Sequence, residues 1–392
     1  MANAAELLAQ GKDIIRYGKL AEGRGLFEQA LALDPANFDT RLELIRVALL
    51  DRDMDRAHGH IMEARKIDPD NPRLVALQGV WFLENLQFAN AKQALEWAAT
   101  KLEKDSDVHC NLSIVYRAMG DVGKAEIEAR KSVELNPKSD VAHFELSKVL
   151  TMKGELGNAM LEVSESIAVN PFFLNAYVTL AQFFVAVKQI DEAIRVYQLG
   201  LQAFPELEFF HSQLALLYEQ KQDFKGALAS MEHAAKIHKT YPILLRVGVY
   251  AMLNKDVKRS EEAFLESIRL DPNAWDAYYD LGELYHVNGN LDGAEKYYRE
   301  AITRVKDQDY RPYNGLGLLL INKRRALEAG EFLNHSLAIQ PGAIEPTINM
   351  AVMYVSLQDS QKARDWALRG RELAQGNKHY VDKADMILAQ VK

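Results

Sequence analysis

We predict an all-α fold built from a repeated pair of short helices, and three observations lead to it. Apolar residues recur three and four positions apart along almost the whole chain of 392 residues, and turn-forming residues interrupt them at short, even intervals. Runs with the alternating pattern of β-strands are scarce. Alanine recurs at a step of 34 residues, in the series Ala57, Ala91, Ala125, Ala159, Ala193 and Ala227. A fixed step of this size indicates a repeat architecture.

Alignment on this step divides the chain into eleven repeats, each numbered here from position 1. The repeats begin at Ala4, Phe38, Pro72, Ser106, Asp140, Leu174, Glu208, Tyr241, Trp275, Tyr310 and Ile344. Small side chains at positions 8, 20 and 27 predict close approach of neighbouring helices, and large side chains at positions 4, 7, 11 and 24 fill the remaining space. Proline occupies position 32 in seven repeats, where it ends the second helix.

This pattern strongly resembles the tetratricopeptide repeat, a helix–turn–helix of 34 residues, over residues 4–377. The resemblance implies a right-handed superhelical α-solenoid whose first helices line a concave groove. Each repeat buries its apolar face only against its neighbours, so the last repeat needs a cover. Residues 378–392 are predicted to form a C-terminal capping helix, with Val381, Ala384, Ile387 and Leu388 turned inward.

Composition narrows the expected class of protein. A net charge of −8 does not favour a nucleic-acid-binding surface. The single cysteine, Cys110, excludes an intrachain disulfide framework and a multi-cysteine zinc site. The N-terminal residues lack the basic start and apolar core of a signal peptide, and no apolar run has the roughly 18 to 20 residues of a membrane helix. We therefore expect a soluble, cytoplasmic protein without direct membrane insertion.

The motifs that could suggest a chemical site are explained by their positions in the repeat. The stretch "MGDVGKAE" has the wrong spacing for a phosphate-binding loop, and it supplies the turn between two helices. His109, His143 and His211 all occupy position 4, a packing position, so we interpret them as structural. Cys110 is interpreted as a small filler, with a reactive thiol as the alternative. No nucleophile with a base and an orienting group is visible. The sequence predicts a protein that is not an enzyme and has no catalytic, cofactor or metal site.

The candidate partner-binding residues follow from the resemblance, because positions 2, 5, 9, 12 and 13 of each first helix face the groove in this family. The residues predicted to bind a partner stand at these positions. They are Lys12, Arg16, Leu42, Arg46, Leu49, Arg73, Val80, Phe144, Val178, Val185, Leu216, Leu245, Val249, Tyr279, Glu283 and His286. The apolar members form a long stripe, which we interpret as a partner site. The alternative is that adjacent first helices, or the cap, cover much of it.

Charge is uneven along the same face. The basic residues at groove positions in the first three repeats are Lys12, Arg16, Arg46 and Arg73. Later repeats have acidic residues there, at Glu219, Asp276 and Glu283. This arrangement predicts an elongated ligand with its acidic part toward the N-terminal repeats, with ordinary solvated surface charge as an equal alternative. The carboxylate clamp of chaperone-binding relatives is not reproduced, and an asparagine ladder at position 6 is present only at Asn111 and Asn349.

The predicted function is that of a non-catalytic interaction scaffold. We expect it to bind an extended or amphipathic helical segment of a protein or peptide partner, and no nucleic acid. One alternative is a structural protein that self-assembles into homo-oligomers through its stripe or its termini. A second is a regulatory subunit of an enzyme or of a secretion or assembly complex.

Overall fold

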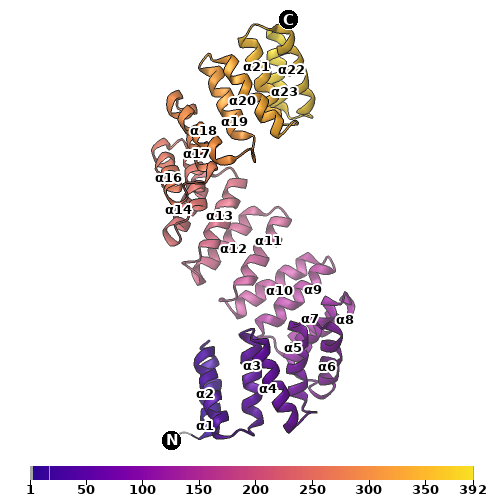
Figure 1. Cartoon of the computed structure of the whole chain (residues 1–392). Helices are drawn as coiled ribbons and strands as arrows, with labels where there is room; N and C mark the ends of the chain where they lie inside the picture. Colours follow the sequence, from indigo (N-terminus) through magenta and orange to yellow (C-terminus); the bar gives the residue numbers. More distant parts are fainter. Residues whose placement is uncertain (1–2, 17, 392) are drawn as a thin grey trace. The chain divides into compact units, whose positions relative to one another are not determined.

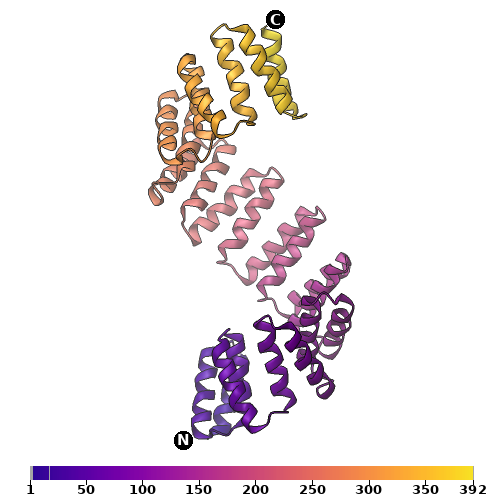
Figure 2. The same ribbon diagram turned by 45° about the vertical axis from the view of Figure 1, so that its right-hand side comes forward.

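The computed structural model describes residues 3–16 and 18–391, with only the backbone of Arg16. Within these residues the regular elements are 23 α-helices, without a β-strand, joined by short turns (Figures 1 and 2). The all-α prediction is therefore confirmed. Among the described residues no helix is both long enough and apolar enough to cross a bilayer.

The chain divides into two compact units, Met1–Ala203 and Phe204–Lys392, which are described separately. Compact unit 1 contains α1 (Ala4–Arg16), α2 (Leu20–Leu33), α3 (Phe38–Leu50), α4 (Met54–Ile67), α5 (Pro72–Glu84), α6 (Phe88–Lys101), α7 (Ser106–Ala118), α8 (Val122–Leu135), α9 (Asp140–Met152), α10 (Leu156–Val169), α11 (Leu174–Ala186) and α12 (Ile190–Ala203). Compact unit 2 contains α13 (Glu208–Gln220), α14 (Phe224–Ile237), α15 (Tyr241–Leu253), α16 (Val257–Leu270), α17 (Trp275–Val287), α18 (Leu291–Val305), α19 (Arg311–Asn322), α20 (Ala326–Ile339), α21 (Ile344–Ser356), α22 (Ser360–Leu373) and α23 (Lys378–Gln390).

The odd-numbered helices α1 to α21 begin at the predicted repeat starts, except that α19 begins one residue later, at Arg311. Each packs against the even-numbered helix that follows it, and that helix packs against the next odd-numbered one within the same compact unit. Successive odd-numbered helices also touch each other, for example α7 with α9 and α19 with α21. The division into an array of residues 4–377 and a cap of residues 378–392 stays a prediction.

Local sequence accounts for where the helices begin. In many repeats the residue at position 16 is Asp or Asn and caps the second helix: the Asp53 side chain accepts a hydrogen bond from the backbone N–H of Arg56, and Asn290 does the same for Gly293. First helices are capped in the same way where the preceding residue is suitable, as when Asn37 accepts from the N–H of Thr40. These caps satisfy N–H groups that would otherwise lack a partner in the first turn.

Close approach of the two helices in a repeat depends on the small residue at position 8. A Cβ atom built on Gly248 would lie 2.4 Å from a ring carbon of Phe264, which occupies position 24 and is fully buried. Gly11 stands in the same relation to Phe27, again at 2.4 Å. These contacts show the close approach predicted for a small residue at position 8, and a larger side chain at Gly248 or Gly11 would push the two helices apart.

The turn inside each repeat needs a left-handed backbone at position 15. Glycine provides it at Gly18, Gly120, Gly154 and Gly289. The other seven repeats place a residue with a side chain there, with positive φ at Arg52, Leu86, Lys188, Gln222, Lys255, Arg324 and Gln358. Such residues carry a steric penalty in this conformation that glycine does not carry.

Replacing Leu86 with glycine is therefore expected to raise the stability of the protein. Leu86 has a φ of 57° and is 73% exposed, so the change relieves the backbone without removing packing. We expect a gain of about 0.5–1 kcal/mol in the free energy of unfolding, measured by chemical denaturation. Leu86→Ala is the control, because it shortens the side chain and keeps the penalty. A glycine variant less stable than the alanine variant would contradict this account.

Candidate protein-binding face

In each compact unit the first helices of the repeats carry a surface, here named the first-helix face, formed by side chains at repeat positions 2, 5, 6, 9, 12 and 13. Polar contacts join successive helices across it. In compact unit 1, Lys12 Nζ lies 3.4 Å from Glu43 Oε1, and Arg117 donates from Nε to Glu145 Oε1 at 2.6 Å. In compact unit 2, Arg246 Nη1 lies 3.6 Å from Glu219 Oε2. Much of the charge on this face is therefore paired with other charged groups of the same chain.

The predicted basic residues near the N-terminus illustrate this pairing. Lys12 and Arg46 share one carboxylate, that of Glu43, with Arg46 Nη2 at 2.9 Å from Glu43 Oε2. Arg73 is exposed, and its Nη1 lies 3.8 Å from Asp39 Oδ1. The side chain of Arg16 lies outside the described residues. Partial neutralisation by Glu43 and Asp39 reduces the positive charge that these repeats can offer to a ligand.

The apolar members of the face differ widely in exposure. Leu42, Leu49 and Phe144 are buried, so these three members of the predicted stripe offer little surface to a partner. The half-buried members are Val80, Val178, Leu245 and Val249. Val185 is 37% and Leu216 is 41% exposed. The open apolar surface thus consists of separate patches, because successive first helices cover the residues between them.

The histidines at position 4 connect neighbouring repeats. His109 Nδ1 lies 2.6 Å from Glu128 Oε2, and its Nε2 lies 3.1 Å from the backbone oxygen of Glu103 in the preceding repeat. His143 repeats both contacts, with Glu162 Oε2 at 2.7 Å and the backbone oxygen of Pro137 at 3.1 Å. Both rings are buried. These contacts give the two histidines the packing role that position 4 predicts.

The thiol of Cys110 is in surroundings that suppress its reactivity. Cys110 is buried, and burial raises the pKa of its thiol to about 12, with the negative charges of Glu145 and Asp107 adding to the effect. The reactive form of cysteine is the thiolate, which such a pKa leaves almost unpopulated at neutral pH. This finding supports the interpretation of Cys110 as a filler.

Next to it lies a buried ion pair that sequence reasoning did not single out. Glu145 is 2% exposed and accepts hydrogen bonds from Nε and Nη2 of Arg117, at 2.6 and 3.1 Å. Burial raises the pKa of the Glu145 carboxyl, and Arg117 opposes that shift. Lys148 Nζ lies 4.4 Å from the centroid of the Phe144 ring, and burial lowers the pKa of that ammonium. Glu145 is at position 6. The resemblance gives that position a role only as the place of an asparagine ladder, so Glu145 is not among the predicted site residues.

Helix α17 carries the predicted site residues Tyr279, Glu283 and His286. His286 Nε2 lies 2.8 Å from Asn322 Nδ2 on α19, and burial lowers the pKa of the imidazole. Asp280, which we did not list, lies one residue from Tyr279. Burial raises the pKa of the Asp280 carboxyl to about 7, and the carboxylates of Glu283 and Asp276 add to the shift. The structure places all of these side chains on one helix, and the three carboxylates raise the negative charge of its exposed face.

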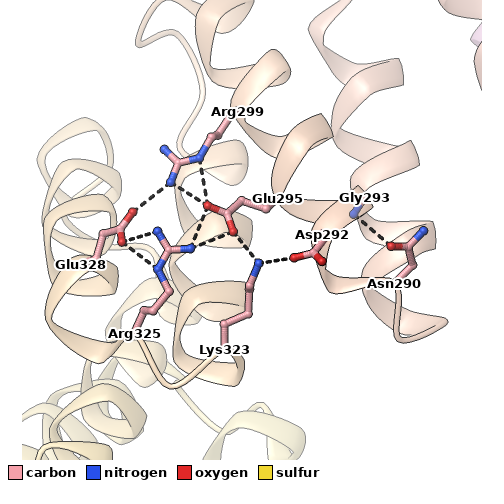
Figure 3. A network of polar contacts seen from close by, with 8 residues as sticks. All are labelled: Asn290, Asp292, Gly293, Glu295, Arg299, Lys323, Arg325 and Glu328. Carbon is pink, nitrogen blue, oxygen red and sulfur yellow. Dashed lines mark hydrogen bonds and ion pairs between the residues drawn. The ribbon is translucent and has the colours of Figure 1, made fainter.

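A second polar network joins the ninth and tenth repeats away from these residues (Figure 3). Glu295 on α18 accepts hydrogen bonds from Arg299, Lys323 and Arg325, and Glu328 accepts from Arg299 and Arg325. Burial alone would raise the pKa of Glu295, but the three donors outweigh it and lower the pKa to about 2. Because the charges pair with each other, we interpret this network as a joint between α18 and α20.

Open clefts are found at the turns. One of about 630 Å³ is lined by residues that include Arg325, Glu328 and Leu357, and one of about 510 Å³ by residues that include Phe184 and Ile190. Among the described residues, no group of three or more His, Cys, Asp or Glu side chains is arranged to hold a metal ion.

The fold and the first-helix face define a protein of the helical-repeat class. Family models described as tetratricopeptide repeat match residues 15–80, 106–139 and 248–310. With its 23 described helices in matching pairs, the chain is a tetratricopeptide repeat protein. Members of this family generally mediate protein–protein interactions.

Individual relatives match only part of their own length. Mouse neutrophil cytosol factor 2 is 30% identical over 103 residues, which is 26% of this chain and 19% of that protein. The Drosophila melanogaster BBSome complex member BBS4 homolog is 21% identical over 194 residues, or 48% of this chain and 39% of that protein. The chain therefore spans less than two fifths of the length of these curated relatives.

Solved structures show the likeness of fold alone. The human IFIT1 dimer with m7Gppp-AAAA is 18% identical, with a TM-score of 0.52, and the match covers 78% of this chain and 72% of that chain. Yeast Tom70 is 15% identical, with a TM-score of 0.45, and the match covers 99% of this chain and 96% of that chain.

Proposed function

We propose that the protein is a non-catalytic scaffold whose first-helix face binds an extended or amphipathic helical segment of a partner protein. The observation that carries this proposal is the exposure of large apolar side chains on a face where most others are covered. In compact unit 2 these include Leu216 and Phe209, each 41% exposed, and Leu253, 44% exposed. Exposed apolar patches bounded by polar residues are typical of interaction sites.

The polar surroundings support a segment as the ligand. Backbone and side-chain polar groups of a bound segment need partners, and Glu219, on the same helix as Leu216, lies 3.6 Å from Arg246, on the same helix as Leu253. An amphipathic helix would place apolar residues at intervals of three and four against Leu216 and Leu253 and leave its polar side toward such groups. This arrangement is the common way in which a shallow apolar surface gains specificity.

Replacing Leu216 with glutamate is expected to weaken binding at least tenfold. The new carboxylate would lose part of its hydration against the apolar side of the ligand. Peptides of 12 residues would be selected from a random displayed library on the full chain, and the affinity of the best one would be measured by calorimetry.

Leu265→Glu is the matched control, because Leu265 is 42% exposed but lies on the even-numbered helix α16. It should leave the affinity unchanged, and both variants should keep the helical circular dichroism of the wild type. Equal loss of binding in the two variants, or no loss in either, would refute the assignment of the face, and a library that yields no binder would refute the proposed function.

A further inference from the structure

Position 6 carries a carboxylate in three repeats, and the three differ in how they are neutralised. Glu43 has Lys12 and Arg46 within ion-pair distance, and Glu145 accepts two hydrogen bonds from Arg117. In the described part of the chain, Asp280 has neither an ion pair nor a hydrogen bond. The carboxylate at position 6 therefore has ion-pair partners among the described residues in two repeats, and in the repeat of Asp280 it has none.

The sequence around Asp280 explains the difference. Glu145 is paired with position 12 of the preceding repeat, where Asp280 finds the apolar Met252. Glu43 is paired with position 9 of its own and of the preceding repeat, where Asp280 finds Glu283 and Val249. The positions that supply a cation to Glu43 and Glu145 therefore carry no cationic residue around Asp280.

Arg311, the cation that acts on Asp280 at longer range, and Arg246 both have other partners. Arg311 on α19 donates two hydrogen bonds from Nε and one from Nη2 to the Asp309 carboxylate, and its guanidinium lies 5.0 Å from the centroid of the Trp275 ring. Arg246 on α15 lies 3.6 Å from Glu219. Arg311 opposes the rise in the pKa of Asp280, but Asp276 and Glu283, which precede and follow it by about one turn on α17, add to that rise.

Asp280 has only partial access to water as a substitute partner. It is partly buried, with burial as the main cause of its raised pKa. A buried carboxylate without a partner is costly, and such groups concentrate at functional sites. Aromatic rings adjoin it: Tyr279 stands next to it in the chain, and Trp275 and Tyr279 have ring centroids 6.5 Å apart.

We infer that the face of α17 formed by Asp276, Asp280 and Glu283 binds a lysine or arginine side chain of the partner segment. This inference rests on the proposed function and names the chemistry of its ligand. A long cationic side chain can reach a recessed carboxylate while its methylene groups lie along the neighbouring rings. A metal ion is a poorer fit, because the three carboxylates do not converge on one point in the described structure.

The test uses the full-length chain and the peptides selected for binding to it. Among binders that Leu216→Glu weakens, lysine or arginine should recur at one position. Asp280→Asn should then weaken the best peptide at least tenfold, and so should replacing its recurrent basic residue with glutamine. Applied together, the two changes should cost little more than either alone, because both remove the same ion pair.

Asp382→Asn, an exposed residue on α23, is the control for the change in net charge and should bind like the wild type. Circular dichroism of Asp280→Asn should be unchanged, since the carboxyl makes no hydrogen bond or ion pair with the described residues. If Leu216→Glu abolishes binding but Asp280→Asn does not, or if the peptides lack a recurrent cation, the inference fails and the proposed function stands. If no peptide binds, both fail.

Discussion

Replacing Arg117 with alanine is expected to destabilise compact unit 1 by about 3–5 kcal/mol at neutral pH. Glu145 is almost inaccessible to water, and Arg117 is its hydrogen-bonded counter-ion. Removal of the guanidinium leaves a charge that must either remain unpaired in a region of low polarity or take up a proton. Urea denaturation followed by circular dichroism measures the loss.

The effect should depend on pH in a defined direction. Burial already raises the pKa of Glu145 in the folded protein above its ordinary value of 4.5, and loss of Arg117 should raise it further. A group with a raised folded pKa binds more protons in the folded state, so it favours folding at low pH and loses that effect as the pH rises through the folded pKa. The Arg117→Ala variant should therefore recover stability as the pH falls from 7 toward 4.5.

Two comparisons make this prediction specific. Arg130→Ala removes an arginine that is half exposed and pairs with Glu126 on the surface of α8, and it should cost less than about 1 kcal/mol. The double variant Arg117→Ala with Glu145→Leu should regain most of the lost stability, because no charge is then stranded. A double variant as unstable as the single one would show that Arg117 acts through packing alone.

Deleting residues 378–392 is expected to convert the protein into an aggregating species. Helix α23 buries Ala384 and Ile387 against Ile348, Ala351 and Ala367 of the last repeat. Without α23 that apolar surface has no further repeat to cover it, and terminal repeats need a polar outer face. Light scattering at increasing protein concentration should show large particles for the truncated chain only.

A pair of point variants tests the same idea without truncation. Ile387→Asp places a charge in the buried contact and should loosen α23, whereas the adjacent Met386 is 72% exposed, so Met386→Asp should have little effect. A truncated protein that stays monodisperse, together with equal behaviour of the two aspartate variants, would contradict a capping role for α23.

Much of the fold could be predicted because its signals are local. A small residue at position 8, such as Gly248, meets the large residue at position 24 of the same repeat, and an Asp at position 16, such as Asp53, caps the helix it precedes. Such contacts join residues a few to about sixteen positions apart, so the 34-residue pattern states them directly. The sequence by itself therefore determined the helices, their order and the packing inside each repeat.

The candidate site required the tertiary structure, because its properties depend on contacts between repeats. Phe144 and Leu216 are both apolar residues at face positions, yet Phe144 is 7% and Leu216 is 41% exposed. Phe144 is covered by the ring of Phe173, 4.8 Å away between centroids, and by Lys148. Arg117 and Glu145 likewise pair across 28 positions, whereas Asp280 has no hydrogen bond or ion pair with any described residue. Burial and charge neutralisation at a position are set by the neighbouring helix, and a pattern within one repeat does not contain that information.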